Sequence, residues 1–428
     1  GNDGTIDLPV TRALLTPLAE QKVAASVSPL VLVDGLSHYL DHFPHGCTEQ
    51  VVSQVFPSIG LLGYPQLVGD RGALQERIDV LISRLRQRQR SDGAFTFWPG
   101  GREAAPFPSL YVMHFLLDTR QFGFTVPRDM LARGEDYLRQ VAYESRDTLA
   151  DSRLRAYAIY LLTRMGQVTT NALVDVQTTL DEKKVAWHED ITAAYVAAAY
   201  QLLRKQDEAE KLIDGYQLSE GKTEDFVTFQ SPLTRDAQYL YLLCRHFPQR
   251  ARQVDGERVL RLIDPVFRGR YNTLSASYTI LALGTYSTLT NPQGEDGRIR
   301  LVAKAEQEQP LDVALKPFAT ADVPLTAHAV LVRSNQRLFA LLSQAGFDSA
   351  LPTQVVREGL EVQRRMMDND GKEVTTVQQG QEVSVELTIR ALGSARDNVA
   401  VIDLLPGGFE VLRDSVPRTA VGWRADYV

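Results

Sequence analysis

The segment FPHGCTEQVVSQVF (residues 43–56) places a cysteine, Cys47, directly after Gly46 and three residues before a glutamine, Gln50. The apolar run after it predicts a helix, and residues three apart in a helix lie on one face, so the two side chains can meet. The positive end of the helix dipole favours a thiolate, which is a better nucleophile than a thiol. The sulfur could then attack the amide carbon, expel ammonia and close an internal thioester ring.

A thioester is an activated acyl group, and it lasts only where water is excluded. Aromatic side chains are therefore expected to shield it, and the sequence offers Phe95, Phe97, Trp98 and Tyr111, besides Phe43 and Phe56 beside the motif itself. Glu49, the residue before the glutamine, is expected to be a first-turn carboxylate that the helix dipole favours.

The same residues have other interpretations. Taken alone, a C-x-E-Q string also fits an ordinary capped helix start. A hydrolase that pairs the cysteine with His45 is disfavoured, because residues two apart point in different directions on a helix. His38, His42 and His45 would make a poor metal site, since Pro44 and Gly46 interrupt the helix before the third histidine. We therefore predict no metal and no other cofactor.

Composition excludes several classes of protein. The chain is 44% hydrophobic and 23% charged, which is typical of a soluble globular protein. Its 46 basic and 53 acidic residues give a net charge of −7, so neither nucleic acid nor anionic lipid is an expected partner. Two cysteines are too few for a disulfide scaffold, and Cys244, within YLYLLCRHF, is predicted to be a core residue. No signal peptide precedes GNDGTIDLPV, and we expect a piece of a larger protein.

An internal repeat organises the first two thirds of the chain. A tyrosine followed by an apolar helical stripe recurs after 46, 38, 44 and 39 residues, at Tyr111, Tyr157, Tyr195, Tyr239 and Tyr278. More charged helical segments lie between these stripes, so each period suits one helical hairpin. We predict a closed α/α toroid of about six hairpins over residues 28–292, with the tyrosine-bearing helices inside.

The pattern changes to alternating strands after residue 292. IRLVAKAEQ, AHAVLVRS and RLFALLSQ, and later EVSVELTIRAL and NVAVIDLL, alternate between turn-rich segments. We predict a small β-sandwich at 293–348 and a second, incomplete β-domain at 349–428. The extended residues 1–27 are expected to pair with the first sandwich. The fold class is thus α + β multidomain, an α/α toroid plus antiparallel β-sandwich domains.

The motif now supports a family assignment. GCTEQ resembles the Gly-Cys-x-Glu-Gln thioester motif of the alpha-2-macroglobulin and complement superfamily, whose thioester domains are α/α toroids. RQRQRSDGAFTFWPGG and PSLYVMHFLL are similar to the pattern that follows the motif in bacterial alpha-2-macroglobulins. LLSQAGFD, EGLEVQRR and VIDLLPGGFEVL resemble their later macroglobulin-like β-domain. The likeness covers nearly the whole chain, and it is greatest to the larger proteins of the YfaS or MagD type.

The resemblance implies an endopeptidase inhibitor rather than an enzyme. A bait region, which this chain does not contain, would be cleaved, and a thioester between Cys47 and Gln50 would capture lysine amines of the protease. The expected location is the periplasm or cell envelope of a Gram-negative bacterium, with other envelope proteins as further partners and a monomeric fragment. ADSRLRAYAIYLL, which aligns with the histidine-bearing helix of complement proteins, has no histidine, so direct attack by amines is expected. A structural toroid with an inactive thioester is the alternative, and an α/α-toroid enzyme ranks below it.

Overall fold

The computed structural model describes residues 5–412 except 145–147, 217, 219–224, 226–227, 291–298, 316–317, 337, 351–354, 358, 394–398 and 400. The chain forms two compact units, residues 1–349 and residues 350–428. Among the described helices, none is both long enough and apolar enough to cross a membrane.

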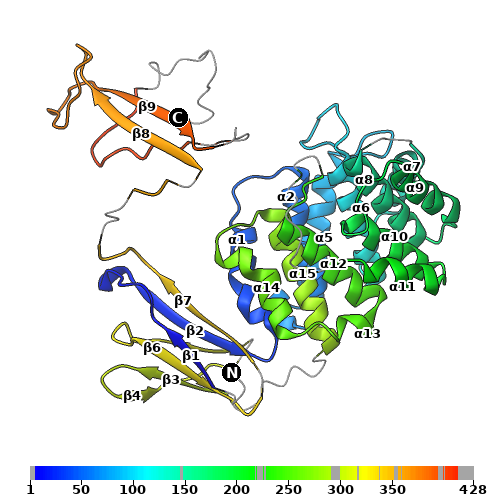
Figure 1. Cartoon of the computed structure of the whole chain (residues 1–428), viewed down its shortest axis with the longest axis horizontal. Helices are drawn as coiled ribbons and strands as arrows, with labels where there is room; N and C mark the ends of the chain where they lie inside the picture. The colour runs from blue at the N-terminus through cyan, green and yellow to red at the C-terminus, as the bar shows by residue number, and fades with distance from the viewer. Residues whose placement is uncertain are drawn as a thin grey trace. The chain divides into compact units, whose positions relative to one another are not determined.

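The first unit contains a helical domain and a β-sandwich (Figure 1). Its helices are η1 Thr16–Leu18, η2 Pro29–Val33, α1 Asp34–Asp41, α2 Thr48–Ser53, α3 Pro57–Gly60, α4 Pro65–Val68, α5 Arg71–Arg86, α6 Pro106–Gln121, α7 Arg128–Tyr143, α8 Leu149–Arg164, α9 Thr170–Glu182, α10 Ile191–Leu202, α11 Gln206–Asp214, α12 Pro232–His246, α13 Pro248–Ala251, α14 Gly256–Phe267 and α15 Thr273–Thr290.

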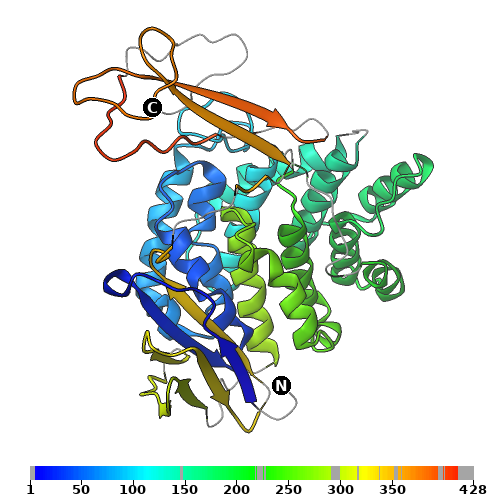
Figure 2. The same cartoon turned by 60° about the vertical axis from the view of Figure 1, so that its left-hand side comes forward.

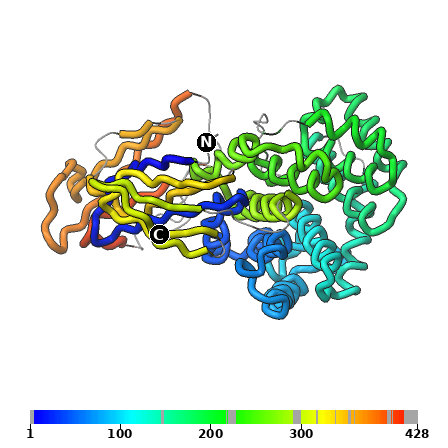
Figure 3. Tube along the Cα trace, turned by 90° about the horizontal axis from the view of Figure 1, so that it is seen from below, coloured from blue at the N-terminus to red at the C-terminus, as the bar shows by residue number. Residues whose placement is uncertain are grey.

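The helical domain is a closed ring. α2, α6, α8, α10, α12 and α15 pack each against the next, and α15 returns to α2 and α3. α5, α7, α9, α11 and α14, which bury one face each, lie outside the ring, and each is joined along the chain to an inner helix. In Figure 3 the chain colours run around the helical domain from blue through cyan to green, and α15 returns beside the first helices. The predicted α/α toroid is confirmed.

Burial explains which helices lie inside. In α10 every residue from Ile191 to Tyr200 is buried, whereas α7 buries one face and leaves the other to solvent. A helix that is apolar all round is stable only when it is surrounded by other elements, and an amphipathic one covers a surface. The repeated tyrosines lie on the inner helices, where Tyr157 stacks on Tyr195 at 4.5 Å and hydrogen-bonds Tyr278 at 3.0 Å.

The last turns of α6, α8, α10, α12 and α15 meet around one cavity at one end of the ring, which is its C-terminal end, and the opposite end is its N-terminal end. At the N-terminal end, Thr273 of α15 hydrogen-bonds Glu49 of α2. Towards the other end, α3 and α15 touch through a pair of glycines. A Cβ atom built on Gly284 would lie 2.4 Å from the carbonyl oxygen of Gly60, so this backbone approach requires glycine.

The β-sandwich combines strands that precede the helical domain in the sequence with strands that follow it. Its strands are β1 Thr5–Pro9, β2 Glu20–Ser26, β3 Arg300–Lys304, β4 Glu308–Pro310, β5 Ala319–Asp322, β6 Ala329–Arg333 and β7 Phe339–Ala345. One sheet has the order β1-β6-β3-β4 and the other β5-β2-β7, with antiparallel pairing throughout. An apolar cluster that includes Val23, Leu301 and Val330 forms its core. The early (blue) and late (yellow) strands lie side by side in Figure 2, so the helices are inserted between β2 and β3.

The second unit contains an antiparallel pair, β8 Leu360–Met367 and β9 Ser384–Ala391. The strand expected in NVAVIDLL is wrong for its described residues, because residues 401–405 join no ladder and Ile402 is 82% exposed. The domain limits expected at residues 28, 293 and 349 stay predictions, since the structure groups the sandwich and the helices in one compact unit.

Candidate functional site

Cys47 is the N-cap residue of α2, with extended backbone angles of φ −65° and ψ 168°. The side chains of Cys47 and Gln50 cap one another's backbone: the cysteine side chain accepts from the N–H of Gln50, and the glutamine side chain accepts from the N–H of Cys47. The distance from the Cys47 nitrogen to Gln50 Oε1 is 2.9 Å. A reciprocal capping box of this kind satisfies two helix donors and holds both side chains together.

Burial controls the protonation of Cys47, which is 8% exposed. Loss of solvation raises the pKa of the Cys47 thiol, and the backbone N–H groups of Gln50 and Glu49 and the nearby Arg88 only partly offset this. The expectation of a thiolate favoured by the helix dipole is therefore wrong. α2 is a short helix, and the cost of burying a charge exceeds what its N-terminus supplies.

Arg88 is a member of the site that the sequence analysis missed. Its Nη2 donates to the carbonyl oxygen of Gly46 at 2.9 Å, and its Nη1 donates to that of Arg84 at 2.9 Å. The side chain is buried, and its Nε has no hydrogen-bond partner among the described residues. Arg88 thus fixes the backbone just before Cys47. It lies in the charged run RQRQR, which gives no sign that one of its members turns inward.

Glu49 lies in the first turn of α2, as expected, and it is a buried acid. It is 4% exposed, and its carboxylate accepts from Ser53 Oγ at 2.7 Å and from Thr273 Oγ1 at 2.9 and 3.0 Å. Burial raises the pKa of Glu49, and the two hydroxyl donors work against that rise. Ser53 also hydrogen-bonds the hydroxyl of Tyr111 at 3.2 Å, which continues to Ser277 at 2.7 Å.

The four predicted shielding residues separate into two groups. Phe95 and Tyr111 are fully buried, whereas Phe97 is 39% exposed and Trp98 is 55% exposed. An aromatic ring that is about half exposed to solvent does not exclude water from its surroundings. The exposure of Trp98 therefore does not support its expected role in shielding a thioester. The backbone of this segment does reach the site, because the Thr48 N–H donates to the Phe97 carbonyl at 2.9 Å.

Histidines do not contact Cys47 or Gln50 through any hydrogen bond in the described part of the chain. His114 is buried on α6, where its Nδ1 hydrogen-bonds the Tyr157 hydroxyl at 2.8 Å and burial lowers its pKa to about 3. The ring of His188 lies beside that of Trp187, tilted by 35°, with the ring centroids 4.1 Å apart. The rings of His38 and His42 are 4.0 Å apart. Within the described ranges, no three His, Cys, Asp or Glu side chains are placed to hold a metal ion.

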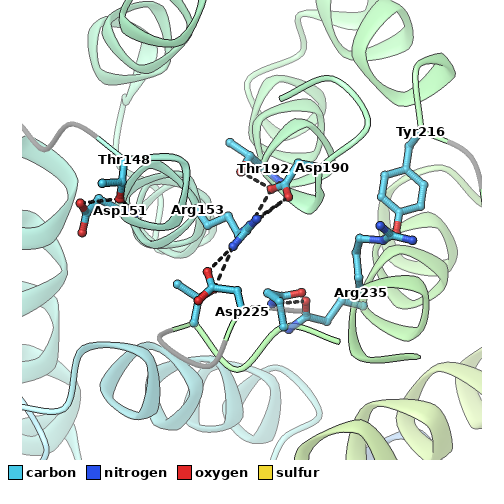
Figure 4. A network of polar contacts seen from close by, with 11 residues as sticks. Thr148, Asp151, Arg153, Asp190, Thr192, Tyr216, Asp225 and Arg235 are labelled. Atoms are coloured by element: carbon cyan, nitrogen blue, oxygen red, sulfur yellow. Dashed lines mark hydrogen bonds and ion pairs between the residues drawn. The ribbon is translucent and has the colours of Figure 1, made fainter. Parts of the chain in front are cut away.

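A buried charge network holds the N-terminal end of the ring on the side of α8 and α10 (Figure 4). Arg153, in the first turns of α8, reaches between Asp190 and Asp225, with nitrogen–oxygen distances of 2.9 Å and 2.5 Å. Asp190 also caps α10 by accepting from Thr192 N–H at 3.0 Å. The stretch ADSRLRAYAIYLL therefore contributes an ion pair to this end of the ring.

Comparison with known proteins gives the family. Residues 359–426 match the family model of the bacterial alpha-2-macroglobulin MG10 domain. The chain is 34% identical to an alpha-2-macroglobulin of Rickettsia conorii and 33% identical to an alpha-2-macroglobulin homolog of Yersinia pestis. The alignments cover 96% and 95% of this chain but 22% and 21% of those proteins, so the chain spans about a fifth of their length.

Solved structures share the fold. Native Escherichia coli alpha-2-macroglobulin from domain MG7 to the C-terminus has a TM-score of 0.64 at 18% identity, covering 91% of this chain and 63% of that one. Salmonella alpha-2-macroglobulin reacted with methylamine has a TM-score of 0.62 at 19% identity, covering 90% and 26%. From its domain match, its relatives and its fold, the chain belongs to the bacterial alpha-2-macroglobulin family.

Proposed function

We propose that this chain carries the reactive centre of a covalent protease inhibitor, in which Cys47 and Gln50 form an internal thioester. The observation that carries the proposal is the reciprocal capping of these two residues. Ring closure needs the sulfur beside the amide carbon, and the 2.9 Å hydrogen bond from Cys47 N–H to Gln50 Oε1 supports that proximity. A donor on the carbonyl oxygen also stabilises the oxyanion that forms during attack.

The proposed chemistry has two steps. In the first, the Cys47 sulfur bonds to Cδ of Gln50, and the amide nitrogen leaves as ammonia. In the second, a lysine amine of a protease attacks the same carbon, an amide bond forms, the carbon–sulfur bond breaks, and the proton lost by the amine goes to the sulfur. Because both steps proceed through the same carbon, Gln50 carries the captured protein and Cys47 is released as a free thiol.

Proteases are the proposed partners. One fold relative, with a TM-score of 0.50 at 18% identity, is Escherichia coli alpha-2-macroglobulin activated by porcine elastase. We extend that partner class to this chain as a proposal, together with a location in the Gram-negative cell envelope. We also propose direct attack by amines, because His114 hydrogen-bonds Tyr157 and His188 packs beside Trp187.

Intact mass tests the thioester. A chain with the bond is about 17 Da lighter than the sequence requires, since one ammonia is lost. Methylamine should then add at Gln50 and release one new thiol. Cys47→Ala should abolish both changes, and Cys244→Ala is the matched control, because Cys244 is the other buried cysteine and should leave both intact. An unmodified mass that does not respond to methylamine would favour the alternative, a structural toroid without reactive chemistry.

A further inference from the structure

A second polar site lies at the C-terminal end of the ring. A cavity of about 760 Å³ opens there, lined by the last turns of the inner helices. Its walls are largely apolar, with Leu117, Leu202 and Leu289 among them, and Arg164 and Arg245 stand in the lining. A volume between about 300 and 1,000 Å³ with apolar walls and a few polar groups is usual for small-molecule sites.

Arg164 is incompletely partnered among the described residues, and Arg245 shares an acceptor with it. The side chain of Arg164, at the end of α8, is 6% exposed. Its Nη2 lies 2.5 Å from Asp118 Oδ1. Both Arg164 and Arg245 donate to one acceptor, Oε1 of Gln121. Nη1 of Arg164 is buried and has no hydrogen-bond partner in the part of the chain that the structure describes. A buried donor without a partner is unfavourable, so this group is suited to an acceptor that enters the cavity.

Positive charge exceeds negative charge at this site. Arg120, Arg164 and Arg245 line the cavity, and Asp118 is the carboxylate that pairs with Arg164. His246, which also lines it, adds no charge at neutral pH, because burial lowers its pKa to about 3. The site therefore has a net positive charge, which the arginines carry.

Helix dipoles offer a simpler explanation, because cations near helix C-termini are favourable. In that case the guanidinium groups should donate to the last carbonyl oxygens of the helices. Arg164 pairs instead with the Asp118 carboxylate, and both arginines donate to the Gln121 side chain. A favourable interaction with the helix C-termini therefore does not explain why Nη1 of Arg164 is buried without a partner among the residues that the structure describes.

We propose that the cavity binds a small amphipathic carboxylate, held by Arg164 and Arg245 with its apolar body along Leu117, Leu202 and Leu289. Guanidinium groups match a planar carboxylate through parallel hydrogen bonds. A fatty acid and the C-terminus of a peptide that ends in an apolar residue share this chemistry. The inference does not depend on the thioester, which belongs to the opposite end of the ring.

Titration calorimetry of the intact chain tests the proposal with four probes. Octanoate and a short peptide with C-terminal leucine are compared with 1-octanol and the amidated peptide, which keep the apolar body and lose the carboxylate. One-to-one binding of octanoate or of the free-acid peptide, at least tenfold tighter than its uncharged counterpart, supports the site and identifies its source. Equal binding of charged and uncharged probes, or no binding of either acid at millimolar concentration, overturns it.

Variants then assign the binding to the arginines. Arg245→Gln should weaken binding of the acid by about tenfold to a hundredfold, the usual range for a lost charge-assisted hydrogen bond. The exposed Arg120→Gln should weaken it less, and it cannot act through the core. Arg268→Gln is the matched control, since Arg268 pairs with Asp264 on α14, outside the cavity. Unchanged affinity in both Arg245→Gln and Arg120→Gln would contradict the proposal.

Discussion

Two buried acids, one near each end of the helical ring, have partners of different kinds. At the N-terminal end, the buried acid Glu49 is satisfied by the neutral hydroxyls of Ser53 and Thr273. At the C-terminal end, the buried acid Asp118 forms an ion pair with the guanidinium of Arg164, and Tyr241 donates to its Oδ2. As a result burial raises the pKa of Glu49, whereas the nearby cations lower the pKa of Asp118 to about 2 despite its burial.

This difference suits the chemistry proposed for each end. A thioester needs dry surroundings with few mobile charges, and hydroxyl donors satisfy an acid without bringing a cation or its water. An anion site needs the opposite, namely fixed cations that retain free donors. Each of the following predictions changes one end and leaves the other as its internal reference.

The largest effect is expected from Asp118→Asn, which removes the charge that pairs with Arg164. Breaking one half of a buried ion pair usually costs about 3–5 kcal/mol, because the remaining charge is left uncompensated. Urea unfolding at pH 7 measures the loss. The control is Asp264→Asn, whose exposed pair with Arg268 should cost at most about 1 kcal/mol. Equal losses in the two variants would show that the buried pair does not stabilise its end of the ring.

The same variant has a pH signature. The pKa of Asp118 is about 2 in the folded chain, below the usual value of about 3.9 in unfolded chains. Its stabilisation is therefore fully present above about pH 4 and is lost as the pH falls towards 2. The free energy of unfolding of Asp118→Asn should depend less steeply on pH in this window than that of the unchanged chain.

A smaller effect is expected at the other end from Thr273→Val, which removes a hydroxyl donor from Glu49. The expected cost is about 1–3 kcal/mol at pH 7, the usual penalty for an unsatisfied buried acceptor. Thr279→Val is the matched control, because that hydroxyl is also buried but donates only to the Ser275 carbonyl within α15.

The sign of the pH dependence is opposite at this end. A raised pKa means that the folded chain favours neutral Glu49, so this group destabilises the fold as the pH rises through its folded pKa. Losing the Thr273 donor raises that pKa further. Unfolding measurements should therefore show a larger cost for Thr273→Val at pH 7 than at pH 4, and a cost independent of pH would exclude the link to Glu49.

Features that depend on local spacing could be predicted from the sequence. The tyrosine period predicted the ring, and the three-residue spacing of Cys47 and Gln50 brought those side chains together. Features that depend on long-range packing could not. One partner of Glu49 is Thr273, 224 residues away, and nothing near either residue indicates the other. The sequence predicted a lowered pKa for the Cys47 thiol, whereas burial raises it. The position of a residue in a helix can be predicted from the sequence, but its burial cannot.

Each end of the ring also has one cysteine. Burial raises the pKa of Cys244 to about 12, and it raises the pKa of Cys47 as well, although backbone donors and Arg88 oppose the rise there. Because the thiolate reacts and the thiol does not, Cys244 should be alkylated by iodoacetamide at least tenfold more slowly than a free Cys47 at pH 8. Peptide mapping over time measures both sites in one sample, and faster reaction of Cys244 would reverse the assignment.

The smallest effect is expected from Arg88→Gln. Of the groups that lower the pKa of Cys47, Arg88 makes the smallest contribution. Its loss should therefore slow alkylation of a free Cys47 by only about twofold to threefold. Loss of the hydrogen bond to Gly46 could change the rate through geometry instead, and the pH profile separates the two causes. An electrostatic role moves the midpoint of the Cys47 profile upwards, whereas a geometric one changes the rate at every pH and leaves the midpoint in place. Arg84→Gln, on the exposed side of α5, is the control and should change neither quantity. Cys244, at the opposite end of the ring, should react at the same rate in all three proteins, and a change there would mean that the substitution loosens the whole ring rather than the Cys47 end.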